Sequence, residues 1–233
     1  MESPVNCRAF CFSIIFYPFG KNTDKVKKID IPAEKIFFTS DMHFGHEGII
    51  IFANRPFDSA EKMDQTLIRN WNQTVPEDGL TFVLGDIGNT DKKPVMEKLN
   101  KLNGQKILIR GNHDHIYKEE ALRTVFEEIH DLLYIRIFAN RASRYQYIAL
   151  CHYPMLDWQN SFRGAWQLFG HLHTREIIEF EYFKTRLFPK QYDVGVDNND
   201  FRPVSFYTIE KLISEQKNDR RFKRTNYSCD YGK

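Results

Sequence analysis

Three short apolar runs in the first half of the chain each read as a buried strand. They are rich in Ile, Leu and Phe, and they lie at residues 35–39, 80–84 and 106–110. Apolar runs of this length, bounded by polar or turn residues, are typical of strands that are covered on both faces. The pattern therefore indicates a sheet that lies inside the molecule.

Stretches with helical spacing separate these runs. Asp58, with Glu61 three residues later, predicts a capping box, and apolar side chains then recur along one helical face. Pro94 and Gly104 suit the first turn and the end of a second helix. A third helix is expected around residues 118–128. Because strands and helices alternate, the first half predicts a wound α/β sheet.

The second half of the chain has a different pattern. Its segments read as strands, and no long helix separates them before the C-terminus. The predicted strands lie at 134–139, 145–151, 166–169, 177–184 and 205–209. This pattern favours hairpins in a second sheet that packs on the first.

The two ends of the chain differ from this core. Residues 1–33 are predicted to be an N-terminal extension with an extra strand and a charged connector, and residues 216–233 a charged, flexible tail. The domain itself is expected at 34–215. The apolar stretch at 10–19 is too short to cross a bilayer, which takes about 20 residues, and no small-residue cleavage site follows it.

Composition indicates an enzyme-sized globular domain and nothing finer. The 233 residues fit one large domain, and 42% hydrophobic residues suffice for a sizeable core. A net charge of +2 creates no overall field that would attract a nucleic acid or a membrane. Four scattered cysteines are too few for a disulfide framework, which favours a reducing, cytoplasmic compartment.

Polar side chains follow five of the apolar runs. They are Asp41 and His43, Asp86, Asn112, His113 and Asp114, His152, and His171 with His173. Because α/β proteins bind ligands at the carboxyl ends of their strands, we expect these side chains to converge. A convergent set of Asp, Asn and His side chains predicts a metal site, and specifically a two-metal site.

Each of these motifs is a weak signal by itself. Asp41 and His43 alternate on an extended segment, so both can bind one ion, but for this motif alone a polar loop is the favoured explanation. Asp86 after its strand is interpreted as a carboxylate that bridges two ions about 3.5–4 Å apart. His171 and His173 alternate in the same way but could serve different ions. The prediction depends on all five segments occurring together.

Residues 111–114, Gly-Asn-His-Asp, form the strongest single motif. The amide oxygen of Asn112 is a neutral ligand, which keeps the site attractive to an anionic substrate. His113 is expected to reach the substrate rather than a metal. Asp114 is expected to hold the His113 ring and to favour its protonated form.

The order of the motifs resembles that of the calcineurin-like metallophosphoesterases. The resemblance runs from about residue 35 to residue 203, and residues 40–46 and 54–57 are similar to a compact bacterial or phage branch of the family. It implies an α/β fold, a four-layer αββα sandwich of two mixed β-sheets flanked by helices. Leu172 departs from the Ser or Thr that many members carry there, but this position is not a ligand.

The resemblance also implies a role for each site residue. One ion would be held by Asp41, His43, Asp86 and His173. The other would be held by Asp86, Asn112, His152 and His171, with Asp86 bridging. His113 would be the catalytic histidine near the leaving group. Family members commonly use manganese, iron, nickel or zinc, so two divalent transition-metal ions are the expected cofactors.

Two residues near the first motif are candidates for substrate binding. His46 would contact the substrate phosphate or cap the adjoining helix. Arg55 would clamp the phosphate with two parallel hydrogen bonds, the alternative being a surface arginine beside a proline turn.

The predicted activity is hydrolysis of a phosphate monoester or diester by a hydroxide shared between two ions. His113 would protonate the leaving oxygen, and nucleotide-like diesters fall within the expected substrates. The nearest alternative is a nuclease, which should have a basic groove with aromatic side chains. The second alternative is a non-catalytic scaffold, and the complete set of ligands argues against it. The sequence indicates neither a membrane partner nor an oligomeric state.

Overall fold

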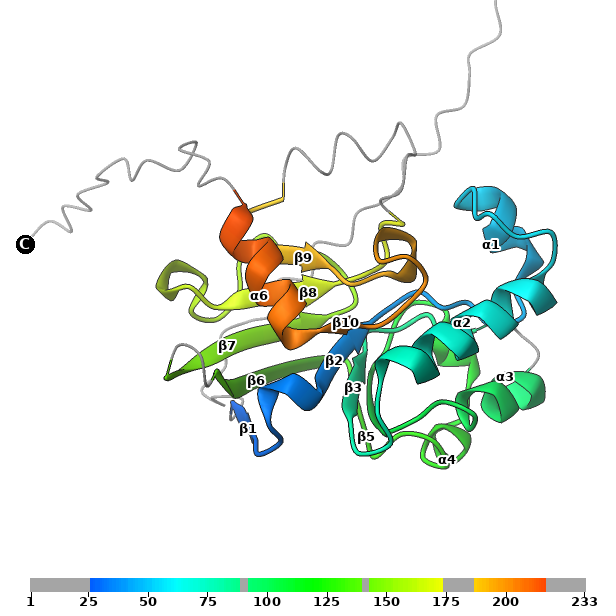
Figure 1. Ribbon diagram of the computed structural model, residues 1–233, viewed down its shortest axis with the longest axis horizontal. Coiled ribbons are helices and arrows are strands. Elements are labelled where there is room, and N and C mark those ends of the chain that lie inside the picture. The colour runs from blue at the N-terminus through cyan, green and yellow to red at the C-terminus, as the bar shows by residue number, and fades with distance from the viewer. Residues whose placement is uncertain (1–25, 89–91, 140–142, 174–186, 217–233) are drawn as a thin grey trace, which may run out of the picture.

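The computed structural model describes residues 26–88, 92–139, 143–173 and 187–216 (Figure 1). Ten strands in this part of the chain form two five-stranded sheets. The first sheet has the order β10-β2-β3-β4-β5, and only β10 runs antiparallel to its neighbour. Its strands are β10 (Val204–Ser205), β2 (Ile36–Thr39), β3 (Leu80–Val83), β4 (Gln105–Ile109) and β5 (Glu128–His130).

The second sheet has the order β1-β6-β7-β8-β9. Its long hairpin of β6 and β7 is antiparallel, and the other neighbours are parallel. Its strands are β1 (Lys27–Ile29), β6 (Leu132–Ala139), β7 (Arg144–Cys151), β8 (Trp166–Phe169) and β9 (Gln191–Asp193). Both sheets are therefore mixed.

The main hydrophobic core lies between the two sheets. Side chains alternate across a strand, so Ile36 and Phe38 of β2 point into this core, where Phe38 stacks on Phe82 of β3. They meet residues of the second sheet such as Ile135 and Leu168. This packing places the carboxyl ends of strands from both sheets along one edge of the molecule.

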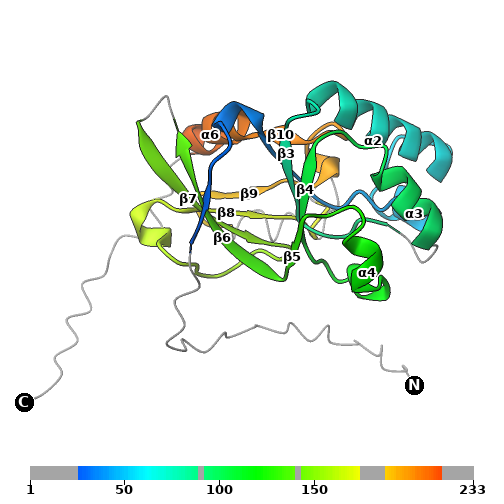
Figure 2. The same cartoon turned by 90° about the horizontal axis from the view of Figure 1, so that it is seen from below.

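Helices cover the outer face of the first sheet. They are α1 (Glu47–Phe52), α2 (Ala60–Thr74), α3 (Lys92–Leu99) and α4 (Glu119–Leu122). Phe37, on the opposite face of β2 from Phe38, packs with Met63, Leu67 and Trp71 of α2 in a second core. Figure 2 shows α2, α3 and α4 on the side of this sheet that faces away from the second sheet.

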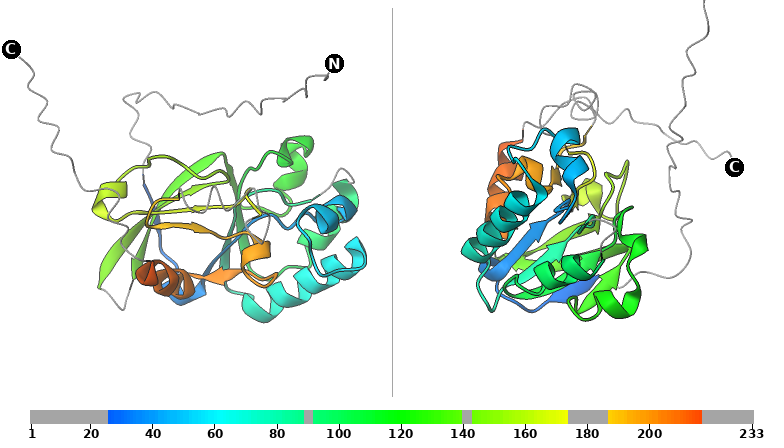
Figure 3. Two further views of the ribbon diagram at one scale, coloured as in Figure 1. Left: turned by 90° about the horizontal axis from the view of Figure 1, so that it is seen from above. Right: turned by 90° about the vertical axis from the view of Figure 1, so that its right-hand side faces the viewer.

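The second sheet has a different cover. Ala149 of β7 packs with Trp158 and Ala165, which lie in the loop around the short helix η4 (Ser161–Arg163). Helix α6 (Phe206–Glu215) contacts β10, β2 and β9 and contributes Phe206, Ile209 and Ile213 to the core between the sheets (Figure 3). The predicted α/β sandwich of two mixed sheets flanked by helices is confirmed.

Several predicted elements need correction. Ser59, not Asp58, caps α2, because its hydroxyl accepts the hydrogen bond from the Lys62 amide. The third predicted helix is shorter than expected, and β5 begins at Glu128 inside its range. Residues 205–209, predicted as a strand, belong mainly to α6, whose first turn Ser205 caps.

The first strand begins inside the predicted N-terminal extension. Part of the predicted extension, Lys27–Ile29, forms the edge strand β1 beside β6, so the sandwich begins before residue 34. The predicted strands at 10–19 and 177–184 and the tail from 217 lie outside the described residues. Within the described part of the chain, no helix is long and apolar enough to cross a membrane.

Candidate metal centre

Polar side chains from five strand ends meet at one edge of the sandwich. Each lies within four residues of the end of a strand: Asp41 and His43 follow β2, Asp86 follows β3, Asn112 follows β4, His152 follows β7, and His171 and His173 follow β8. The six Asp and His side chains form two groups, and in each group the potential ligand atoms lie within 4.8 Å of one another. The predicted convergence is therefore present in the structure.

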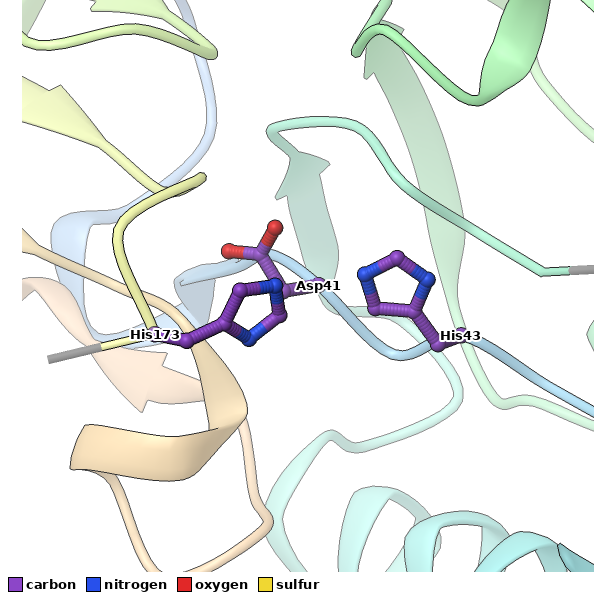
Figure 4. A group of neighbouring side chains, drawn as sticks. All are labelled: Asp41, His43 and His173. Carbon is purple, nitrogen blue, oxygen red and sulfur yellow. The ribbon is translucent and has the colours of Figure 1, made fainter. Parts of the chain in front are cut away.

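The first group consists of Asp41, His43 and His173 (Figure 4). All three are buried, and Asp41 Oδ1 and both ring nitrogens of His43 have no hydrogen-bond partner. A buried polar atom without a partner costs about 1–3 kcal/mol. A divalent cation coordinated by these atoms would remove that cost, so the group fits a metal ion.

The second group consists of Asp86, His152 and His171, with Asn112 beside them. The Asn112 Oδ1 atom lies 3.0 Å from His152 Nε2 and 3.0 Å from His171 Nδ1. The Leu84 carbonyl oxygen, 2.6 Å from His152 Nδ1, accepts a hydrogen bond from that nitrogen. This bond leaves the lone pair of His152 Nε2 directed at the group, which is the usual arrangement of a metal-binding histidine.

Asp86, a member of the second group, also lies close to the first group. Its Oδ2 atom is 3.6 Å from His43 Nε2 of the first group and 3.5 Å from His152 Nε2 of the second. Its Oδ1 atom accepts a hydrogen bond from the backbone N–H of His113 at 2.9 Å. One carboxylate oxygen is thus close to a histidine of each group.

Backbone conformation directs these side chains inward. Five of them have left-handed φ angles, which Asp and His tolerate better than most residues: Asp41 59°, His43 50°, Asp86 54°, His171 71° and His173 46°. Two glycines permit close approach, because a Cβ atom on Gly111 would collide with the Asp86 carboxylate and one on Gly170 with that of Asp41. This explains the glycine at the start of both motifs.

The charges within the site suit cation binding. Burial holds the pKa of His43 well below its usual value, and burial together with the neighbouring His152 lowers that of His171 to about 4. Both rings are therefore neutral, as a metal ligand must be. Burial alone would lower the pKa of His152, but Asp86 and Asp41 raise it to about 9, so an ion must displace that proton.

Asp114 does not hold the His113 ring as predicted. It is fully buried, and both of its oxygens accept backbone N–H bonds: Oδ2 from Asp86 at 2.9 Å and Gly111 at 2.8 Å, and Oδ1 from Ile87 at 3.0 Å. Both carboxylate oxygens are thus used in hydrogen bonds to the backbone around Asp86 and Gly111. Asp114 fixes the shape of two ligand loops rather than the protonation of His113.

The predicted phosphate clamp at Arg55 is wrong. Its guanidinium is buried, and all five of its N–H groups already have acceptors inside the protein. These are both carboxylate oxygens of Asp197, the carbonyl oxygens of Asp41 and Met42, and Met63 Sδ. No donor is left for a substrate.

Sequence reasoning missed Asp197. It lies in the short helix η5 (Val196–Asn198), and its Oδ2 accepts a hydrogen bond from His173 Nδ1 at 2.8 Å. Burial alone would raise the pKa of Asp197, but His173 and Arg55 bring it down to about 2. The only signal in the sequence is an acidic residue shortly after β9, the same kind of position that Asp86 occupies after β3.

Two histidines stand at the rim. The His113 side chain is 52% exposed, and its Nε2 atom is 4.0 Å from Asp86 Oδ2. The His46 ring lies 5.5 Å from that of His43 and 6.5 Å from that of His113, measured between centroids. His46 occupies the N-cap position of α1, but its side chain makes no capping hydrogen bond, so the predicted capping role is wrong.

This combination of an α/β sandwich and two adjoining Asp/His groups at its strand ends is typical of metal-dependent phosphoesterases. The chain belongs to the calcineurin-like phosphoesterase family, whose model matches residues 34–152. The resemblance predicted from the motifs is therefore confirmed. Members of the family act as hydrolases of phosphate esters and usually bind divalent metal ions.

Relatives occur in an archaeon, a phage and a bacterium. An uncharacterized protein of Methanocaldococcus jannaschii is 33% identical over 185 residues, which cover 78% of this chain and 93% of the relative. The gene 66 protein of Mycobacterium phage L5 is 28% identical over 69% of this chain and 86% of its own. The crystal structure of a protein of unknown function from Aquifex aeolicus matches with a TM-score of 0.57 and 27% identity, over 76% of this chain and 98% of that one.

Proposed function

We propose that this protein hydrolyses phosphate esters with two divalent transition-metal ions. The first ion would be held by Asp41, His43, His173 and Asp86. The second would be held by Asp86, Asn112, His152 and His171. The observation that supports this proposal best is the position of Asp86 Oδ2, 3.6 Å from a histidine of one group and 3.5 Å from a histidine of the other. A carboxylate shared by both groups is what a two-metal site requires.

When bound, two such ions supply a hydroxide nucleophile near neutral pH and offset charge on the phosphoryl oxygens. The chain's own residues then orient the reacting groups. The Asp114 carboxylate holds the Asp86 and Gly111 backbone, and the His113 amide holds the Asp86 carboxylate. The exposed His113 ring is placed to donate a proton to the leaving oxygen of an ester bound at the rim.

His46 is proposed to contact the phosphate. Its ring lies beside His43 and His113, and partial burial, together with the charge of His113, lowers its pKa. A neutral ring offers the substrate one N–H donor without a positive charge. The proposed substrate class is a phosphate monoester or diester, including nucleotide-like diesters, and the proposed metals are manganese, iron, nickel and zinc.

A metal-by-substrate panel tests this function. Metal-free protein would be reloaded with each of the four metals and assayed on an aryl monoester, an aryl diester, cyclic nucleotides and single-stranded DNA. We expect hydrolysis of at least one small ester with at least one metal, and no hydrolysis by the Asp86→Ala variant. Cleavage of DNA alone would favour the nuclease alternative. Failure on every combination, in a protein that binds two ions, would favour the scaffold.

A further inference from the structure

The carboxylate of Asp197 contacts the first ligand group through one ring nitrogen of His173. Its side chain is 1% exposed, and Oδ2 accepts the N–H of His173 Nδ1 at 2.8 Å. Because Nδ1 carries this proton, the lone pair of His173 lies on Nε2. The hydrogen bond also restrains rotation of the ring. Asp197 therefore orients the ligand His173 without itself being a predicted ligand.

Arg55 connects this carboxylate to a second ligand. Its Nε and Nη2 atoms each donate to an Asp197 oxygen at 2.8 Å, and Nη2 also donates to the Asp41 carbonyl oxygen at 2.7 Å. Nη1 donates to the Met42 carbonyl oxygen at 3.2 Å. The backbone between Asp41 and His43 is thus fastened to the same buried group that orients His173.

The second ligand group is supported by different contacts. His152 Nδ1 donates to the Leu84 carbonyl oxygen, and Asp86 and Gly111 are held by Asp114. In the described part of the chain, the hydrogen bonds of Arg55 and Asp197 reach His173 and the Asp41–Met42 backbone but no member of the second group. The two groups also hydrogen-bond to each other through backbone N–H groups, His43 N–H to the Asp86 carbonyl oxygen and His171 N–H to Asp41 Oδ2, but Arg55 and Asp197 contact the first group alone among the described ligands.

We propose that Arg55 and Asp197 are positioning residues that set the affinity of the ion bound by Asp41, His43 and His173, without setting that of the other ion. This inference rests on the proposed function, because it requires two ions. Partners that orient a metal ligand typically change metal affinity by about 10–100-fold. We expect a loss in that range at one of the two sites and little change at the other.

The alternative is a buried ion pair that serves folding alone. Removing one partner of such a pair leaves an uncompensated buried charge, whereas replacing both charges relieves that penalty. Asp197→Asn should therefore lower stability and weaken one ion. The double variant Arg55→Gln/Asp197→Asn should recover stability but keep the weakened ion. A neutral Asn oxygen is a weaker acceptor for His173 than a carboxylate, and Gln offers two N–H donors where Arg offers five.

The test is a calorimetric titration of metal-free protein with Mn²⁺, together with electron paramagnetic resonance of the loaded protein. Wild type should bind two ions and give the signal of a coupled pair. Asp197→Asn and the double variant should bind one ion with unchanged affinity and the other about 10–100-fold more weakly. At one ion per chain they should give the signal of isolated Mn²⁺.

Leu80→Ala is the matched control, because Leu80 is buried at the opposite end of β3 from Asp86. It should lose stability through a cavity and keep both affinities. Unchanged affinities in Asp197→Asn would overturn the positioning role alone. So would a double variant that regains both stability and the wild-type affinity for the ion at Asp41, His43 and His173. A wild-type protein that binds no ion would overturn the proposed function as well.

Discussion

The His113 side chain is exposed at the edge of the metal centre, whose ligands Asp41, His43, Asp86, His152 and His173 are buried. A proton donor in this position matters most when the leaving oxygen is a poor leaving group. We expect His113→Asn to keep both ions and to slow alkyl esters by about 10²–10⁴-fold. Nitrophenyl esters, whose leaving group hardly needs a proton, should be slowed much less. Steady-state kinetics on both classes, with metal analysis, check this, and equal slowing would instead make His113 a phosphate-positioning group.

Asp86 and Asn112 differ in how many ions they should affect. Asp86 lies between both groups, so Asp86→Ala should lose both ions and nearly all turnover. Asn112 Oδ1 lies 3.0 Å from ring nitrogens of His152 and His171, both of the second group, so Asn112→Ala should weaken mainly one ion. Elemental analysis of the purified variants measures this directly. Two ions per chain and normal activity in Asp86→Ala would contradict a dinuclear centre.

The sequence was most informative about the residues that end strands. All seven predicted metal ligands lie in or beside the two groups, because Asp, Asn and His after apolar runs mark strand ends. The roles of Arg55 and Asp114 were not predictable in the same way. An arginine after a loop looks the same in sequence whether its donors face solvent or five internal acceptors. Asp197 lies far along the chain from His173, and only the packing of η5 brings them together.

The strand β1 is an element whose removal should affect stability more than chemistry. It pairs with β6, its Ile29 is buried between the sheets, and Lys27 pairs with Glu128 of β5. Burial of an isoleucine is worth about 1.5–3 kcal/mol. Deletion through Ile31 should therefore lower the free energy of unfolding by at least about 2 kcal/mol relative to deletion of residues 1–25.

Chemical denaturation of the two truncated proteins measures that difference. Turnover per metal-loaded, folded molecule should be the same in both, because β1 supplies no ligand. A deletion variant that folds and binds two ions but is inactive would show that this strand shapes the substrate site.

Helix α2 offers a comparison of two adjacent residues. Ser59 accepts the Lys62 amide hydrogen bond, whereas Asp58 forms an exposed ion pair with the Lys62 side chain. We expect Ser59→Ala to destabilise the protein by about 1 kcal/mol, and Asp58→Ala to destabilise it less. Thermal unfolding of both variants measures the difference, and the reverse order would restore Asp58 as the cap.

Most element types followed from periodicity, but element ends and the type of one short apolar segment did not. Ser and Asp are both good caps, so the pair Asp58-Ser59 left the boundary open by one residue. Residues 205–209 are short and apolar enough to read as a strand. They belong to α6 because Phe206, Ile209 and Ile213, at helical spacing, fill the core between the sheets. Tertiary packing determined the secondary structure of this segment, because its local sequence preference was compatible with both a strand and a helix.

At the scale of the molecule, metal binding should stabilise the fold. A ligand present at about 1,000 times its dissociation constant adds about 4 kcal/mol, which corresponds to roughly 8–16 °C in Tm for a chain of this size. We expect chelation to lower the Tm by an amount in that range and reloading to restore it. Asp86→Ala is the control, because its Tm should not respond to chelator. A wild-type Tm that changes neither on chelation nor on reloading with metal would contradict the metal centre.

The overall architecture was predictable because each half of the chain has one dominant pattern. Alternating strands and helices in the first half predict a wound sheet, and successive strands in the second half predict another. How the outer face of the second sheet is covered was not predictable. The loop around Trp158 has no periodic signal, and its packing on Ala149 depends on the sheet already being in place.

The left-handed backbone at five ligand positions has a consequence for laboratory evolution. A residue held in such a conformation costs of order 1 kcal/mol, which glycine does not incur. In the metal-free protein, His43→Gly would relax this cost and remove two buried ring nitrogens that have no hydrogen-bond partner. A library selected only for thermal stability in the presence of chelator should therefore accumulate glycine at these ligand positions. Selection of a variant that is both more stable and active would require that metal be supplied and turnover be measured in every round.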